Sequence, residues 1–293
     1  MTTRWLLLLP LLVLLSACGT FSRSGGYYQD DGPGSNPPPD VASIPDAVPR
    51  DEPRSQSGNN PYTVDGVTYY PLARAGGYHE RGIASWYGRK FHGKRTSSGE
   101  PYDMYSMTAA HKTLPLPSYV RVRNLQNGRS IVVRVNDRGP FLSNRLIDLS
   151  YAGAAKLGII GTGTGIVDVE AVSPEEPPVQ VAGLKSPPLQ MISTAAAVEL
   201  PPRTATPKTP KLYLQVGAFA RRDNAIQLRD RLEREALQPV FIQAAQAPAG
   251  ANAGAAAQIY RVRVGPFATV EEGDRLTQRA AQLGVANALI VVE

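Results

Sequence analysis

The stretch YVRVRNLQNGRSIVVRVND, residues 119–137, contains two runs in which apolar and polar side chains alternate, with turn residues at their ends. Alternation of this kind is typical of strands that bury one face. Further β-like runs in the same block are GIASWYG, YSMTAAH and GIVDVEAV. The block has one clear helix, from Ser150 as N-cap to Gly158 as stop. Many short strands with one helix predict a small closed β-barrel over residues 78–172.

Residues 211–293 contain one pattern twice. The strand-like runs LQVGAF and RVRVGPF are each followed by a turn and an amphipathic helical segment, and then by a second apolar run, PVFIQA or ALIVVE. The order β-α-β-β-α-β predicts an α+β domain of the ferredoxin-like type. An Ala- and Gly-rich insertion, residues 246–258, lengthens the connection between the two central strands, which costs little because loop-closure entropy grows slowly with length.

The first residues, MTTRWLLLLPLLVLLSACGT, carry one positive charge, an apolar core and small residues that lead to the only cysteine, Cys18. This is the pattern of an export signal over residues 1–17, and its apolar part is shorter than the ~20 residues that cross a bilayer. The segment resembles the bacterial lipobox, which implies cleavage before Cys18 and lipidation of its thiol. By the same resemblance, Gly19 after the cysteine implies an anchor in the outer membrane.

Two segments rich in Pro, Gly and Ser flank the predicted barrel. Residues 18–77 and 173–210 show little apolar periodicity, so we expect disordered linkers that bury too little apolar surface to offset the entropy of ordering. The barrel block has 13 lysines and arginines against 7 aspartates and glutamates. In an exported lipoprotein this excess favours an anionic extracytoplasmic polymer over nucleic acid. Three dispersed histidines and no free thiol predict neither a metal site nor a cofactor.

The barrel block carries carboxylates suited to acid–base chemistry. Glu100 and Asp137 each lie next to Gly or Pro in a loop, where a side chain reaches a cleft with little packing constraint, and His111 would complete the cluster. Plainer interpretations are a turn former for Asp137, a solvated charge for Glu100 and a structural histidine for His111. Asp148, near Arg145, is interpreted as a backbone acceptor ahead of the helix and as a lesser catalytic candidate.

Aromatic and basic side chains surround these carboxylates. The residues that we expect either in the core or as flat platforms for sugar rings are Trp86, Tyr87, Tyr102 and Tyr105. Arg138 is expected to contact the substrate. If Arg134 and Arg138 both pointed at Asp137, they would lower the pKa of its carboxyl group, and Glu100 would be the better acid.

The segments GIASWYGRKFHGKRTSSGEPYDM, MTAAHKTLP, VRVNDRGPF and RLIDLSYAGAAKLG together resemble the double-psi β-barrel of the rare lipoprotein A family, septal-ring lytic transglycosylases of peptidoglycan. Lipobox, Pro-rich linkers and terminal domain follow in the family's order. The resemblance implies cleavage of N-acetylmuramic acid–N-acetylglucosamine bonds in strands without stem peptides, with 1,6-anhydro ends. It implies that Asp137 acts first as acid and then as base, that Glu100 orients the sugar or stabilises positive charge, and that His111 hydrogen-bonds to substrate or to a carboxylate.

The segments LQVGAFARRDNA and RVRVGPF resemble the sporulation-related repeat, or SPOR domain, whose members bind septal peptidoglycan that has lost its stem peptides. Loss of the peptide exposes a lactyl carboxylate on every second sugar. Arg261 and Arg263 alternate along one strand and share a sheet face, so both could pair with such carboxylates, and Gln215 in a neighbouring strand could add a hydrogen bond. A solvated outer face is the alternative for both arginines.

Three functions stay open at this point. The first is a lytic transglycosylase tethered to the periplasmic side of the outer membrane and concentrated at the division septum by its SPOR domain, with division proteins as further partners. The second is inverting hydrolysis, with a water between Glu100 and Asp137. The third is a non-enzymatic septal lipoprotein that binds peptidoglycan, because related barrels in expansins loosen polysaccharide without evident hydrolysis.

Overall fold

The structure of the chain is a computed structural model. It describes residues 31–32, 40–142, 144–174, 210–246, 258–285 and 287–293. Cys18, the predicted signal segment, most of the Pro-rich linker and most of the Ala- and Gly-rich insertion lie outside these residues. What the sequence predicts for them stays a prediction.

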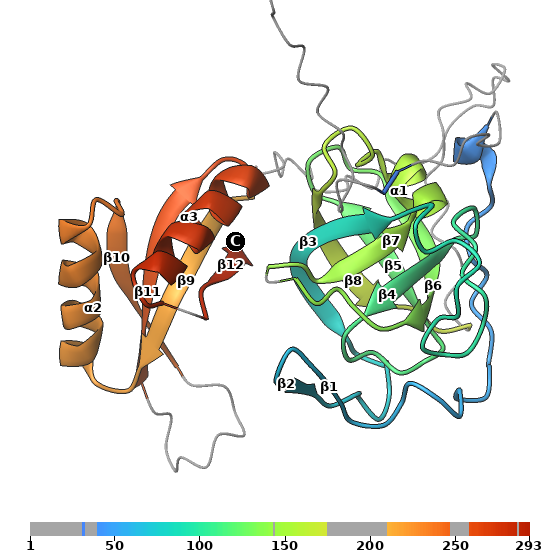
Figure 1. Cartoon of the computed structure of the whole chain (residues 1–293), viewed down its shortest axis with the longest axis horizontal. Helices are drawn as coiled ribbons and strands as arrows, with labels where there is room; N and C mark the ends of the chain where they lie inside the picture. Colours follow the sequence, from blue (N-terminus) through green and yellow to red (C-terminus); the bar gives the residue numbers. More distant parts are fainter. Residues whose placement is uncertain (1–30, 33–39, 143, 175–209, 247–257, 286) are drawn as a thin grey trace, which may run out of the picture.

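Six strands of the described chain close into a barrel, on the right of Figure 1. They are β3 His79–Tyr87, β4 Thr108–His111, β5 Ser118–Asn124, β6 Ser130–Asp137, β7 Ile147–Ser150 and β8 Gly165–Ala171. The order around the barrel is β3-β7-β4-β6-β5-β8; β3–β7 and β4–β6 are parallel pairs and the other pairs are antiparallel. The closed barrel predicted from the sequence is confirmed, although β7 was not among the predicted strands.

Alternate side chains of these strands fill the barrel. Ala109 of β4, Val133 of β6 and Leu149 of β7 are fully buried in the same apolar core. Because successive side chains of a strand point to opposite faces, the residues between them lie on the outer face. The packed interior therefore fixes which side chains the barrel presents outward.

The helix α1, Tyr151–Leu157, packs against β6 and β7. The Ser150 hydroxyl accepts a hydrogen bond from the backbone N–H of Gly153, as an N-cap does. Gly158 ends the helix in the left-handed conformation with φ 80°, which glycine adopts without steric cost. Both predicted helix ends are confirmed.

Residues 40–77, which we call the strap, pack against the barrel, where the sequence predicts a disordered linker. The strap contains the 3-10 helix η1, Val41–Ser43, and a hairpin of β1, Tyr62–Val64, and β2, Val67–Tyr69. At the hairpin turn Asp65 has φ 49° and Gly66 φ 77°, as a two-residue turn with matching twist requires. Figure 1 shows the hairpin below the barrel.

Polar side chains hold the strap in place. Both oxygens of the Glu52 carboxylate accept hydrogen bonds from the guanidinium of Arg134, at 2.9 and 2.7 Å. The Asn59 amide donates to the carbonyl oxygen of Leu116 at 2.7 Å and accepts from the N–H of the same residue at 2.9 Å. Apolar periodicity does not reveal anchors of this kind, which explains why the composition predicts a linker.

The second domain has the predicted β-α-β-β-α-β order. Its elements are β9 Leu212–Phe219, α2 Arg222–Arg234, β10 Val240–Gln246, β11 Gln258–Phe267, α3 Val270–Gln282 and β12 Leu289–Val292. The sheet is antiparallel in the order β10-β11-β9-β12. Leu214 and Val262 of the sheet pack with Leu232 of α2 and Ala280 of α3 in one core. Both helices therefore cover one face of the sheet and leave the other face open.

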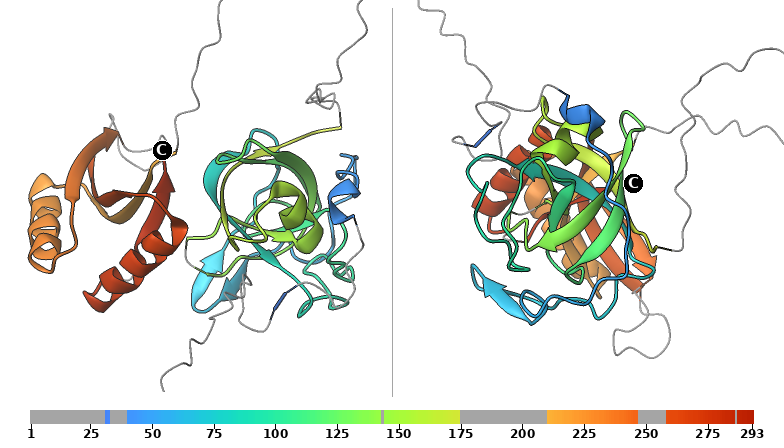
Figure 2. Two further views of the ribbon diagram at one scale, coloured as in Figure 1. Left: turned by 90° about the horizontal axis from the view of Figure 1, so that it is seen from above. Right: turned by 90° about the vertical axis from the view of Figure 1, so that its right-hand side faces the viewer.

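The two domains lie side by side (Figures 1 and 2). The Arg145 guanidinium pairs with the Asp274 carboxylate of α3 at 2.7 Å. The Asn144 amide donates to the Thr277 hydroxyl at 2.9 Å and accepts from the N–H of Ile290 in β12 at 2.9 Å. The loop after β6 thus makes the polar contacts with the second domain.

Replacing Asn59 should destabilise the folded chain. Asn59→Ala removes the acceptor of the Leu116 N–H, a group in the interior, so we expect the free energy of unfolding to fall by about 1–3 kcal/mol. Urea denaturation of the chain without its first 18 residues measures the change. Asn60→Ala, at the exposed next position, is the control with an expected change below about 0.5 kcal/mol. Equal midpoints for the two variants would show that the Asn59 hydrogen bonds do not stabilise the folded chain.

Candidate functional site

Four side chains form a row across four neighbouring strands of the barrel. Ser85 of β3 is the register partner of Asp148 of β7, and Ala110 of β4 is the partner of Asp148 on one side and of Asp137 of β6 on the other. The core residue Ala109 points inward, and Ala110 belongs to an apolar cluster outside the barrel with Tyr87 and Tyr102. The row therefore lies on the outer face. Two strand spacings, about 10 Å, separate the backbones that carry the two carboxylates.

A cavity of about 220 Å³ opens over this row. Asp137 and Asp148 both line it, with the small side chain of Ala110 between their strands. Its walls consist of aromatic and apolar side chains, the loop after β6 and the tip of the strap hairpin: Asp65, Tyr87, Phe91, Arg138, Gly139, Pro140, Phe141 and Leu142. The space between the two acids is thus open to a ligand.

Asp148 is the buried acid of the cavity. Its side chain accepts a hydrogen bond from the hydroxyl of Ser85, and the residue is 8% exposed. Burial raises the pKa of its carboxyl group from 3.8 to about 6, against the opposing effects of the Ser85 hydrogen bond and of the Arg145 and Lys112 charges. A carboxyl group with such a pKa retains a proton in mildly acidic solution and can donate it.

Asp137 is held in a different way. Its Oδ1 accepts hydrogen bonds from the N–H and the hydroxyl of Ser97 and from the N–H of Arg138, all at 2.7 Å. Among the described residues no hydrogen-bond donor reaches Oδ2, so this oxygen is available to a ligand. The loop that contains Ser97 therefore fixes the Asp137 carboxylate at the end of β6.

The structure places Glu100 against Arg134 and Asn136 of β6, outside the lining of the cavity. Its carboxylate pairs with Arg134 at 2.8 Å and accepts from the Asn136 amide at 3.2 Å, and its side chain is 43% exposed. Burial raises the pKa of Glu100, but the hydrogen bonds from Arg134 and Asn136 outweigh that effect and hold the pKa below its ordinary value. An acid of this kind is poorly suited to donate a proton near neutral pH.

His111 follows Ala110 in β4 and points to the opposite face, so the structure does not bring it into the cavity. Its Nδ1 accepts from the backbone N–H groups of Thr113 and Leu114, at 3.1 and 3.0 Å. Nε2 therefore carries the ring proton and donates it to the Tyr78 hydroxyl at 2.8 Å. Burial and two positive neighbours lower the pKa of the imidazole to about 3, so the ring is neutral.

The two arginines near Asp137 both turn to other partners. Arg134 is paired with Glu52 and Glu100. The Arg138 guanidinium donates to the carbonyl oxygens of Gly58 at 2.8 Å, of His111 at 2.9 Å and of Leu114 at 2.5 Å. Arg138 thus ties the strap to the loop after β4, and only its backbone N–H reaches Asp137.

Of the expected sugar platforms, Trp86, Tyr87 and Tyr102 are buried, and Tyr105 is half-buried and does not line the carboxylate cavity. Trp86 is 2% exposed and belongs to the barrel core. Tyr102 is also 2% exposed; its hydroxyl donates to the carbonyl oxygen of Tyr87 at 2.6 Å, and its ring stacks on the Tyr87 ring with a centroid distance of 4.1 Å. Tyr87, not Tyr102, lines the cavity, so Tyr102 supports the wall from behind.

In the second domain Arg261 and Arg263 lie on one strand, β11. Arg263 is 2% exposed, pairs with the Glu293 carboxylate and stands over the Tyr213 ring at 5.9 Å. Gln215 of β9 is the register partner of Arg263. Arg261 is half-buried and has no such pairing among the described residues, so it is the arginine available on the open face.

Comparison with known proteins places these features in a family. Residues 79–171 match the family described as "Lytic transglycolase", and residues 208–291 match the SPOR domain. The chain is 42% identical over 321 residues to the endolytic peptidoglycan transglycosylase RlpA of Pseudomonas aeruginosa, which covers 93% of this chain and 92% of that protein. The chain belongs to the RlpA family.

Two further similarities are with a relative from another organism and with a solved domain. The protein of the same name in Vibrio cholerae is 52% identical over 169 residues, which cover 58% of this chain and 64% of that protein. The crystal structure of the RlpA SPOR domain from Pseudomonas aeruginosa is 31% identical and covers 27% of this chain and 96% of that one, with a TM-score of 0.24. The predicted double-psi barrel and SPOR domain of an RlpA-type chain are confirmed by the matched families, whereas the strap precedes both matched ranges.

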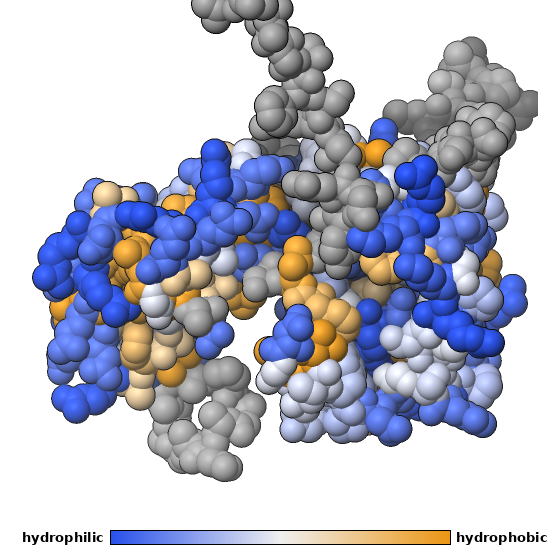
Figure 3. All heavy atoms as spheres, in the orientation of Figure 1, coloured by the Kyte–Doolittle hydropathy of each residue, from blue (hydrophilic) through white to orange (hydrophobic). Residues whose placement is uncertain are grey.

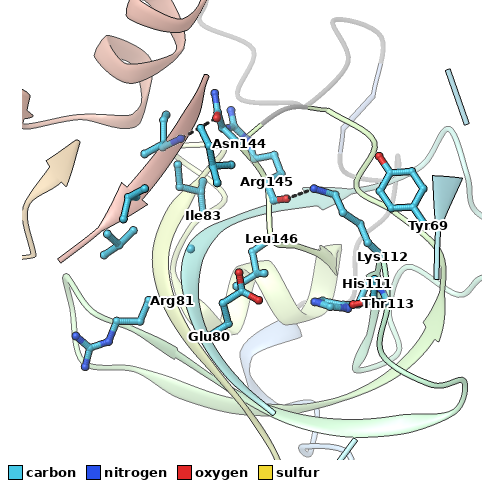
Figure 4. Close-up of a pocket in the computed structure, with 15 residues that line it drawn as sticks. Tyr69, Glu80, Arg81, Ile83, His111, Lys112, Thr113, Asn144, Arg145 and Leu146 are labelled. Carbon is cyan, nitrogen blue, oxygen red and sulfur yellow. Dashed lines mark hydrogen bonds between the residues drawn. The ribbon is translucent and has the colours of Figure 1, made fainter. Parts of the chain in front are cut away.

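A second cavity, of about 410 Å³, lies between the barrel and the SPOR domain (Figure 4). Glu80, His111 and Lys112 line it from the barrel, and residues 289–292 of β12 line it from the other side. The Lys112 ammonium donates to the carbonyl oxygen of Arg145 at 2.7 Å, and its pKa is lowered by burial. Neither Asp137 nor Asp148 lines this cavity, so it is separate from the carboxylate row.

Apolar surface also marks this side of the barrel. Figure 3 shows hydrophobic side chains gathered where the barrel faces the SPOR domain. Phe141 and Leu142, at the mouth of the carboxylate cavity, are 38% and 51% exposed.

In the described ranges no helix is long and apolar enough to cross a membrane, and no cluster of three potential metal ligands occurs.

Neutralising Asp148 should stabilise the chain at high pH. A raised folded-state pKa means that the stability which Asp148 contributes is fully present below pH about 4 and is lost as the pH rises through about 6. We expect Asp148→Asn to exceed the natural chain in free energy of unfolding by roughly 2–3 kcal/mol at pH 8, and to match it within about 1 kcal/mol at pH 4. Urea denaturation at both pH values measures the difference. A difference that does not change with pH would contradict the raised pKa.

Proposed function

We propose that this chain cleaves the glycan strands of peptidoglycan as a lytic transglycosylase, with the carboxylate row of the barrel as its active site. The observation that carries the proposal is the register of Asp148, Ala110 and Asp137, which puts two acids with unlike surroundings on either side of one small residue. The matched families and the names of the relatives supply the substrate and the type of reaction.

The two acids divide the chemistry. Asp148, with its raised pKa, gives its proton to the glycosidic oxygen as the bond from that oxygen to C1 of N-acetylmuramic acid breaks. The free Oδ2 of Asp137 takes the proton of the 6-hydroxyl of the same sugar as the O6–C1 bond forms. No water is consumed, the product carries a 1,6-anhydro end, and proton exchange with solvent restores both carboxyl groups. This division replaces a single residue that acts twice, the role that the resemblance assigns to Asp137.

The other predicted catalytic residues have supporting roles in this proposal. Glu100 neutralises Arg134 and helps Asn136 to fix the end of β6 next to Asp137. His111 holds the turn after β4, whose carbonyl oxygens bind Arg138, the residue that follows Asp137. Substituting His111 would therefore disturb the active site although the ring does not reach the sugar.

Inverting hydrolysis is the second candidate. The observation in its favour is the distance between β6 and β7, the strands that carry the two acids. Inverting glycosidases hold their two carboxyl groups ~6.5–9.5 Å apart, with a water between acid and base. Side chains that converge from backbones about 10 Å apart can meet this requirement. Asp137 would then activate the water and Asp148 would remain the acid.

The open face of the SPOR sheet is the proposed second binding site, for strands without stem peptides. Arg261 binds a lactyl carboxylate, and Gln215 adds a neutral hydrogen bond. Arg263 binds a second carboxylate when the ligand displaces Glu293 from its ion pair with Arg263. A barrel and a SPOR domain on one chain raise each other's effective concentration on the same glycan. With a lipid on Cys18, this arrangement supports a location at the periplasmic side of the outer membrane, enriched at the division septum, with division proteins as partners.

Asp137→Asn should abolish cleavage. We expect the rate on peptide-free sacculi to fall by about 10²–10⁴-fold, because the amide cannot accept the hydroxyl proton, while binding to sacculi is unchanged. Release of soluble glycan measures the rate, and mass spectrometry of the fragments from the natural chain separates anhydro ends from the reducing ends of hydrolysis. Full activity of the variant would remove Asp137 from the mechanism, and a natural chain that binds without cleaving would leave the non-enzymatic alternative.

Arg261→Ala should weaken binding to peptide-free sacculi. Loss of one charge-assisted hydrogen bond is expected to lower the affinity about tenfold, and added salt should narrow the difference. Co-sedimentation at several salt concentrations measures both effects. Arg275→Ala removes the same charge from an exposed position of α3, and it should bind as the natural chain does. Equal losses in the two variants would indicate general charge attraction and no specific site.

A further inference from the structure

We propose that the strap hairpin and Phe141 form a sugar-binding subsite next to the carboxylate cavity, which receives the adjoining sugar of the glycan strand. The inference rests on the proposed function, because it takes its ligand from that reaction. It assigns a role in substrate binding to residues that precede the matched barrel domain, which begins at residue 79.

A hollow of about 400 Å³ lies beside the carboxylate cavity. Arg138 and Phe141 line both spaces, so the two spaces adjoin. Ser97 lines the hollow, and its N–H and hydroxyl hold Asp137, which lines the cavity. A polymer bound across Asp137 therefore continues directly into the hollow.

The size of the carboxylate cavity makes a neighbouring subsite necessary. At about 220 Å³ it is smaller than the ~300–1,000 Å³ of pockets that enclose drug-sized ligands. A glycan strand is a linear polymer, so the sugars on either side of the cleaved bond need separate places. On the strap side, the hollow is the space that adjoins the carboxylate cavity.

The surface of the hollow suits a sugar. Tyr62 and Phe141 present aromatic rings at a centroid distance of 6.0 Å, and Tyr69 stacks behind Tyr62 at 5.2 Å. Sugar rings have apolar C–H faces that pack on such rings, and Asn60 and Ser97 supply polar groups for the hydroxyls and the N-acetyl group. The walls thus combine the two kinds of contact that an N-acetylated sugar needs.

The strap is anchored so that this surface keeps its place. The Tyr62 hydroxyl donates to the carbonyl oxygen of Lys112 at 2.7 Å, and the Arg138 guanidinium stands over the Tyr62 ring at 5.9 Å. Arg138 also binds the carbonyl oxygen of Gly58 in the strap at 2.8 Å. One residue next to Asp137 therefore positions the hairpin relative to the catalytic carboxylate.

The test is steady-state cleavage of peptide-free glycan strands by the chain without its first 18 residues. We expect Tyr62→Ala to lower kcat/KM about tenfold, mainly through a higher KM, because binding is lost while the acids stay in place. Phe141→Ala, which leaves the hydrogen bonds of the strap in place, should act in the same direction. Tyr62→Phe keeps the ring without its hydroxyl and should restore most of the loss.

Tyr70→Ala is the matched control, since Tyr70 is 68% exposed, follows Tyr69 and lines neither space. Its kinetics should equal those of the natural chain. Unchanged KM in both Tyr62→Ala and Phe141→Ala would overturn the subsite alone, as would a loss confined to kcat, which indicates a disturbed active site. A natural chain that cleaves no glycan would overturn the proposed function and this inference together.

Discussion

The register of β7 against its two neighbours is the constraint on which the site depends. Ile147 and Leu149 are fully buried in the barrel core, and this fixes Asp148 between them on the outer face. A shift of one residue would turn the carboxylate into the core and both apolar side chains outward, so the packing of the interior excludes it. Antiparallel pairing with β4 then places Asp148 against Ala110, and parallel pairing of β4 with β6 adds Asp137. Residues far apart in sequence meet because the sheet closes.

The surroundings, and not the residue type, distinguish the two acids. Asp148 is largely buried and accepts a hydrogen bond from a single hydroxyl group, whereas Asp137 lies at the strand end and accepts three hydrogen bonds. Enzymes obtain an acid and a base from two carboxyl groups by environments of this kind. Glu100 is paired with Arg134, which it shares with Glu52 of the strap. The Arg134 ion pairs thus lower the pKa of Glu100 and also attach the strap.

Local patterns predict much of this fold and less of its site. Alternating strands, the caps Ser150 and Gly158 and the repeated half of the SPOR domain depend on neighbours in sequence, and these predictions hold. β7 has only four residues and leads directly into α1, so periodicity does not separate this strand from the start of the helix. Asp148 is therefore interpreted from the sequence mainly as a backbone acceptor ahead of the helix and only as a lesser catalytic candidate. The strap is held by long-range polar contacts that composition does not report. The sequence places aromatic rings near the acids but does not show which face of the barrel each ring lies on. It therefore does not distinguish buried rings, such as those of Trp86 and Tyr102, from exposed ones.

The loop from Gly139 to Leu146 connects the chemistry with the second domain. Its first part lines the carboxylate cavity, and Asn144 and Arg145 make the polar contacts with α3 and β12. Such contacts contribute about 0.5–1.5 kcal/mol each. Apolar packing accompanies them, because Ile83 and Ile166 of the barrel are buried in one cluster with the core of the SPOR domain. Because the loop follows Asp137 directly, one short segment carries both the wall of the carboxylate cavity and the polar contacts of the domain interface.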